Sequence, residues 1–208
     1  MILQTLFENP IVFIVWLTAI IVPIGLHEFA HAFAATVQGD PTPKSMGRLT
    51  LNPLAHIDPL GIFLLLIAGF GWGKPTPFNP MNLRNTRWGT VLVAAAGPIS
   101  NLIMIIIFGL FLKFLYPSLG PDNLLTIFLI ALVQINVILM MFNLIPIPPL
   151  DGSKVLFGFI DISTETQAKF ERIGPMLLLG LIIMEQFSGL GILRYLFGGV
   201  ADMIFSLI

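Results

Sequence analysis

The 208-residue chain contains no cysteine and few charged residues. Without cysteine it can form neither disulfides nor thiolate metal sites, so any metal must be held by imidazole and carboxylate groups. Charged residues make up 10% of the chain, whereas a soluble domain carries about 25%. Because 56% of the residues are hydrophobic, the composition predicts a protein that folds in the lipid bilayer rather than in water.

The ten lysines and arginines are dispersed, and the formal net charge is −1. A nucleic-acid-binding protein concentrates basic residues on one surface, so nucleic acid is excluded as a partner. No basic segment precedes the first apolar run, so we expect that run to remain in the protein rather than to act as a removable signal peptide. The sequence leaves the oligomeric state open.

Apolar runs long enough to cross a hydrocarbon core of about 30 Å predict a polytopic, all-α bundle of transmembrane helices. The predicted spans cover residues 10–37, 88–115, 124–145, 173–187 and 190–207. The run 60–70 is too short for an ordinary span and is predicted to be re-entrant. No internal repeat or appended soluble domain is evident, so residues 1–208 are predicted to form a single domain.

The distribution of basic residues predicts the orientation, because lysine and arginine stay preferentially on the cytoplasmic side. With the N-terminus outside and 60–70 re-entrant, eight of the ten basic residues lie inside. They are Lys44, Arg48, Lys74, Arg84, Arg87, Lys154, Lys169 and Arg172. A fully spanning 60–70 would place three of them outside, so the re-entrant topology is favoured.

The first predicted span carries the motif His-Glu-Phe-Ala-His, with His27, Glu28 and His31 as its only ionisable groups. Residues four apart share a face of a helix, so both imidazoles can reach one zinc ion while Glu28 lies beside the water that zinc activates. Ionisable groups are costly inside a membrane and are functional by default. The motif therefore predicts zinc-dependent hydrolysis with Glu28 as general base.

A catalytic zinc site needs a third protein ligand. Asp151 follows a proline-rich break after the third span, where non-helical backbone is tolerated if it is buried or lines a cavity. His56 is the other candidate, although it could instead form a hydrogen bond that fixes the polar loop, or lie in solvent. Asn143, also close to the break, could donate a hydrogen bond to a developing oxyanion.

Two further features lie in the second span. Gly97 with Pro98 indicates a close helix approach or a kink. The amide of Asn101 must find a hydrogen-bond partner there, and a contact that joins two helices is one interpretation.

Four sequence blocks occur in order along most of the chain: His27–His31, Gly47–Pro59, Ala96–Asn101 and Asn143–Gly152. With them the chain resembles the site-2 proteases, a family of intramembrane zinc metalloproteases, in the short branch without an inserted PDZ domain. The resemblance implies one zinc ion held by His27, His31 and Asp151, water activation by Glu28, support from Asn143, and transmembrane proteins as substrates.

Two stretches are predicted to be extended, and they form the β-like part of the expected fold near the active site. Arg48–Leu51 has strand character, and the prolines of Lys74–Asn79 exclude helix. Because a helical substrate must be unwound before cleavage, either stretch could capture it as an added strand.

The leading prediction is therefore an intramembrane zinc metalloendopeptidase in the cell membrane, with its active site nearer the cytoplasmic face. A membrane metal-ion transporter would place ion-binding residues on several spans, usually in a repeated topology. A catalytically silent scaffold would be expected to have lost the glutamate or a ligand. The sequence shows neither pattern.

Overall fold

The computed structural model describes residues 2–188 and 191–207, which form helices and no strand. The helices are α1 (Ile2–Glu8), α2 (Pro10–Val37), α3 (Thr42–Ser45), α4 (Pro59–Ala68), α5 (Thr86–Leu119), α6 (Leu124–Asn143), α7 (Asp151–Phe159), α8 (Thr164–Ser188) and α9 (Ile192–Leu207). Short 3₁₀ turns, η1 (Pro53–His56) and η2 (Pro80–Asn82), lie in the polar segments.

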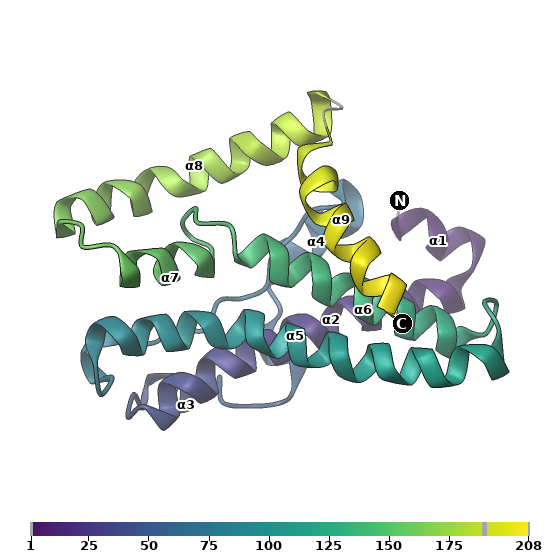
Figure 1. Cartoon of the computed structure of the whole chain (residues 1–208), viewed down its shortest axis with the longest axis horizontal. Helices are drawn as coiled ribbons and strands as arrows, with labels where there is room; N and C mark the ends of the chain where they lie inside the picture. Colours follow the sequence, from purple (N-terminus) through teal and green to yellow (C-terminus); the bar gives the residue numbers. More distant parts are fainter. Residues whose placement is uncertain (1, 189–190, 208) are drawn as a thin grey trace.

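Three helices form the centre of the molecule: α2, α5 and α6 pack against one another, and α5 runs along its length (Figure 1). Each begins after an asparagine whose side chain accepts a hydrogen bond from the first turn, namely Asn9, Asn85 and Asn123. Ala19 of α2 and Ala131 of α6 are fully buried in a shared cluster, so these helices approach closely through small residues. The described part of the chain is thus an all-α membrane protein.

These three helices are long and apolar enough to cross a membrane. α2 has the bounds expected for the first span, and α5 extends beyond 88–115 at both ends. α6 stops two residues before the expected end of 124–145. Large hydrophobic side chains on the outer face of α5 are exposed, including Ile103 and Ile106, as expected of a surface that faces lipid.

The expected spans 173–187 and 190–207 fall in α8 and α9, although residue 190 lies outside the described residues. Within the described ranges neither helix meets the length and apolarity of a span. α8 lies at the edge of the molecule beyond α7, and α9 turns back to pack against α6 (Figure 1). Their membrane crossing stays a prediction.

α4 corresponds to the run 60–70, and the chain reverses around it. Asp58 caps its N-terminus by accepting from the amides of Leu60 and Gly61, and Gly69 ends it in the left-handed conformation. An antiparallel bridge then joins Ile57 to Gly73. The two segments that flank this ten-residue helix therefore meet, as they would around a re-entrant helix, and the position of α4 in the membrane stays a prediction.

The expected strand at Arg48–Leu51 is wrong, because side-chain hydrogen bonds take the place of a strand ladder. Arg48 is buried, and its guanidinium donates to the carbonyls of Ala55, Lys74 and Pro75. The Ile57–Gly73 bridge is the only β-type pairing among the described residues.

The Lys74–Asn79 segment is not helical, as expected, and it is held at both ends and in the middle. Arg48 binds its first carbonyls, and Asp40 accepts from the amide of Asn79 at 2.7 Å. In the middle, the amide of Thr76 donates to Glu28 Oε2 at 2.7 Å. The segment therefore lies directly beside the His27–His31 motif.

Candidate metal centre and active site

α2 presents His27 and His31 on one face, as their spacing predicts. Both are buried, with 4% and 7% of their surface exposed, and their Nε2 atoms lie 3.1 Å apart. The two imidazoles therefore converge inside the bundle rather than facing lipid.

Asp151 reaches the same point from the first residue of α7. The prolines after α6 end that helix, and the chain turns back through Leu150. Gly152 lets this turn pack, because a Cβ at that position would collide with the carbonyl oxygen of Leu144. Asp151 Oδ2 lies 3.2 Å from His27 Nε2 and 3.2 Å from His31 Nε2.

These three atoms fit a metal ion. Tetrahedral zinc with bonds of about 2.0–2.1 Å holds its ligand atoms roughly 3.3 Å apart, close to the separations seen here. Oδ2 of Asp151 is buried and has no hydrogen-bond partner, so a cation would satisfy it. Among the described residues, His27, His31 and Asp151 are the one group of His, Cys, Asp and Glu side chains that could hold a metal.

The outer nitrogens of both imidazoles are fixed by hydrogen bonds. His31 Nδ1 lies 2.7 Å from the carbonyl oxygen of Val93, which can only accept, so this nitrogen carries the proton. His27 Nδ1 lies 2.6 Å from Asn101 Oδ1. The Nε2 lone pairs of both imidazoles then face the carboxylate of Asp151. These three electron-rich groups repel one another unless a cation lies between them.

The Asp151 carboxyl is held in its charged form. Burial alone would raise its pKa, but hydrogen bonds and positive charge from His27 and His31, when these are protonated, outweigh burial and lower the pKa below its ordinary value. When both imidazoles are neutral, a bound cation would supply that positive charge. Lys154 adds a positive charge, with Nζ 4.0 Å from Asp151 Oδ1. An anionic carboxylate is the form that binds a metal.

Glu28 lies between the two histidines in the sequence and is half-buried. The amide of Thr76 engages its Oε2, and the Thr76 hydroxyl donates to the main-chain carbonyl of Glu28 at 3.0 Å. The first contact orients the carboxylate and the second holds Thr76 against α2, while Oε1 has no hydrogen-bond partner among the described residues.

The two remaining candidates, Asn143 and His56, have hydrogen-bond partners outside this group. The side-chain amide of Asn143 donates to the Leu139 carbonyl of its own helix at 2.9 Å. His56 is fully buried, and its Nε2 contacts the carbonyl oxygen of Thr50 at 3.0 Å. His56 therefore fixes the polar loop in this structure and is not part of the metal-binding group.

Gly97 of α5 allows this helix to pass directly against the two histidines. A Cβ there would lie 2.5 Å from His31 Nε2 and 2.6 Å from His27 Nε2.

We expect Gly97→Ala to lose most of its bound zinc, because the methyl group would push the imidazoles out of their converging positions. Elemental analysis of the purified protein measures this loss.

Gly180→Ala is the matched control, since Gly180 also lies in a helix and a Cβ there meets nothing within 4 Å. It should keep the zinc content of the wild type. Equal zinc content in both variants would contradict the close approach at Gly97.

Several contacting residues were missed by the sequence reasoning. The Val93 carbonyl contacts His31, Asn136 contacts Asn101 behind His27, Thr76 binds Glu28, and Lys154 approaches Asp151. An amide inside an apolar span was a usable signal for Asn136, as it was for Asn101. A main-chain carbonyl such as that of Val93 leaves no signal in a sequence.

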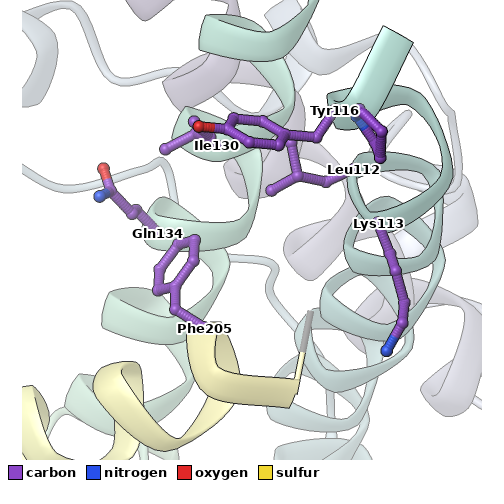
Figure 2. Close-up of a pocket in the computed structure, with 7 residues that line it drawn as sticks. Leu112, Lys113, Tyr116, Ile130, Gln134 and Phe205 are labelled. Carbon is purple, nitrogen blue, oxygen red and sulfur yellow. The ribbon is translucent and has the colours of Figure 1, made fainter. Parts of the chain in front are cut away.

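A separate cavity of about 410 Å³ lies between α5, α6 and α9. Its lining consists of Leu112, Lys113, Tyr116, Pro117, Ile130, Gln134 and Phe205. In Figure 2, Tyr116 reaches across toward Ile130, and Phe205 approaches from α9. Leu112 lies about 22 Å further along α5 than Gly97 at 1.5 Å per residue, so this cavity is not part of the metal-binding group.

Comparisons with known proteins agree with the geometry. The sequence pattern of peptidase family M50 matches residues 118–184, which include Asp151. A Bacillus subtilis protein named "Putative zinc metalloprotease YwhC" is 46% identical over 143 residues, or 66% of this chain and 65% of the relative. "Putative zinc metalloprotease Rip2" of Mycolicibacterium smegmatis is 34% identical over 162 residues, or 74% of this chain and 60% of the relative.

The Mycobacterium tuberculosis H37Rv protein of the same name is 29% identical over 193 residues, which is 89% of this chain and 74% of the relative. The chain spans less than two thirds of the length of the first two relatives. No solved structure matches it significantly. On the family pattern and these relatives, the chain belongs to peptidase family M50, the site-2 protease family.

Proposed function

We propose that the chain is an intramembrane zinc metalloendopeptidase that cleaves membrane proteins in or near their transmembrane segments. One zinc ion per chain is held by His27, His31 and Asp151, and Glu28 is the general base. The observation that carries the proposal is the convergence of three buried ligand atoms within 3.2 Å, on and beside an apolar helix that also carries Glu28.

When bound, zinc supplies the Lewis acidity that activates water and polarises a peptide carbonyl. Glu28 accepts the proton of the attacking water at Oε1, since Thr76 occupies Oε2. It then returns this proton to the leaving amine nitrogen. The Thr76 amide keeps the carboxylate from rotating away during both transfers.

Asn143 keeps its proposed role as a hydrogen-bond donor to the oxyanion. Because its amide donates to Leu139 in this structure, that role requires the side chain to leave the helix carbonyl when substrate binds. The geometry supports Asn143 less than it supports Glu28, which already lies beside the metal ligands.

The two alternatives explain fewer of these contacts. A transporter is expected to have ion-binding groups on several spans, whereas the described residues hold a single candidate metal group. A silent scaffold gives no reason for Thr76 to orient a glutamate next to two converging imidazoles. Zinc-dependent hydrolysis gives a role to each of His27, Glu28, His31 and Asp151.

We place the active site nearer the cytoplasmic side of the cell membrane. From Pro10 to His27, α2 rises about 25 Å at 1.5 Å per residue, so the histidines lie near the far end of a core about 30 Å thick. The basic residues of the adjoining loops favour the cytoplasmic side for that end.

An extended substrate can pair with the Lys74–Asn79 segment, but at fewer positions than the sequence suggests. Thr76 uses its amide on Glu28, and Asn79 uses its amide on Asp40. Among the described residues, the amide and carbonyl groups of Phe78 have no partner, so we propose that substrate pairs there. A proline at Thr76 would therefore disturb the base as well as the pairing.

Co-expression with a panel of single-span membrane proteins tests the function. We expect the wild type to produce fragments that are absent when Glu28→Gln is expressed at the same level. Mass spectrometry of the fragments should place the cleavage in or near the transmembrane segment. Identical fragments with both proteins, or cleavage confined to soluble domains, would oppose the proposal.

A further inference from the structure

A relay of hydrogen bonds leads away from the metal centre into the bundle. His27 Nδ1 contacts Asn101 Oδ1 at 2.6 Å, and Asn101 Nδ2 donates to Asn136 Oδ1 at 2.8 Å. Asn136 Nδ2 then donates to the carbonyl oxygen of Leu132 at 2.7 Å. Both asparagines have no exposed surface, so water cannot replace a partner in this relay.

The last acceptor sets the direction of every bond before it. The Leu132 carbonyl can only accept, so the NH₂ group of Asn136 must face it and the Asn136 oxygen must face Asn101. Asn101 then presents its own NH₂ group to Asn136 and its oxygen to His27. The proton of a neutral His27 consequently lies on Nδ1, and the Nε2 lone pair faces Asp151.

We propose that Asn136 is a positioning residue that fixes the tautomer of His27 through Asn101 and so prepares Nε2 to bind a metal. The inference rests on the proposed function only in requiring that His27 is a metal ligand. Outer hydrogen-bond partners of this kind typically change metal affinity by 10–100-fold.

His31 provides an internal reference, because the carbonyl of Val93 fixes its tautomer directly. Loss of Asn136 should therefore change His27 and leave His31 as it is. If Asn136 merely joined two helices, its loss would lower stability without selecting one histidine.

The test uses metal-free, purified protein with ¹⁵N-labelled histidine, at a pH that keeps the three histidines neutral. The ¹⁵N chemical shifts of the ring nitrogens distinguish the two tautomers, and His31→Gln and His56→Gln variants assign the signals. We expect the wild type to carry the His27 proton on Nδ1. In Asn136→Leu this preference should be lost, because the Asn101 amide is free to turn its NH₂ group toward His27.

Asn136→Asp is the conservative variant. Buried in the same place, a protonated carboxyl group can donate to Leu132 and accept from Asn101, so the wild-type tautomer should return. Gln134→Leu is the matched control, since it also replaces an amide of α6 but one that lines the distant cavity. If Asn136→Leu does not fold, Asn136→Ala is measured in its place with the same expectation.

Zinc titration supplies the second measurement. Asn136→Leu should raise the zinc dissociation constant by about 10–100-fold, while Asn136→Asp and Gln134→Leu stay near the wild type. The proposal is overturned if His27 keeps its Nδ1 proton in Asn136→Leu, or if Gln134→Leu weakens zinc binding equally. The tautomer is read without substrate, so an absence of proteolysis would count against the proposed function alone.

Discussion

Glu28→Gln is expected to lower the rate of substrate cleavage by about 10²–10⁴-fold while leaving zinc bound, since that is the usual contribution of a general base. The glutamine keeps the length of the side chain but cannot accept the proton of the attacking water. Glu28 is not part of the converging metal group, so its replacement leaves three ligands in place. Cleavage of an identified substrate and the zinc content of the same preparation measure the two effects.

His27→Ala is the comparison for this experiment, because it removes a ligand and should lose both zinc and activity. If Glu28→Gln lost zinc as completely as His27→Ala, the glutamate would be a metal ligand rather than the general base. Full cleavage activity in Glu28→Gln would exclude it as the base.

Asp151→Ala is expected to reduce zinc affinity by more than the 10–100-fold that loss of an outer partner typically costs. Two histidines alone lack the third protein ligand of a catalytic zinc site, and alanine removes the negative charge that offsets part of the charge of the zinc ion. Competition with a zinc chelator of known affinity, applied to the purified protein, measures the change.

His56→Gln separates the two candidates for third ligand. Glutamine can still donate to the Thr50 carbonyl, so the loop should keep its anchor and the protein should keep its zinc. Loss of zinc from His56→Gln together with retention in Asp151→Ala would make His56 the ligand and Asp151 a turn residue.

The sequence predicted the parts of the fold that depend on local physics. The first span was predicted with its observed bounds because an almost uninterrupted apolar run begins at Pro10 and a polar, glycine-containing stretch follows Val37. The prediction of a strand at Arg48–Leu51 was wrong because it depended on contacts between distant residues. A buried arginine satisfies the surrounding carbonyls, and no residue pattern reports which carbonyls a side chain 7 to 27 residues away will reach.

The candidate site likewise has a part that could be predicted from the sequence and a part that could not. The spacing of His27 and His31 follows from helix geometry, so their shared face could be predicted. Their outer contacts could not, since Asn101 lies 74 residues from His27 and Val93 lies 62 residues from His31. Such contacts exist only once α5 has packed on α2. The pairing of Thr76 with Glu28 depends likewise on how the loop folds back over the helix.

X-ray absorption at the zinc edge of the purified wild-type protein tests whether His27, His31 and Asp151 hold a zinc ion. We expect one zinc per chain, bonded only to nitrogen and oxygen at about 2.0–2.1 Å, with the scattering signature of two imidazoles. The Asp151→Ala variant should lose that spectrum. A signature of three imidazoles, a sulfur ligand, or no stoichiometric zinc would contradict the site formed by His27, His31 and Asp151.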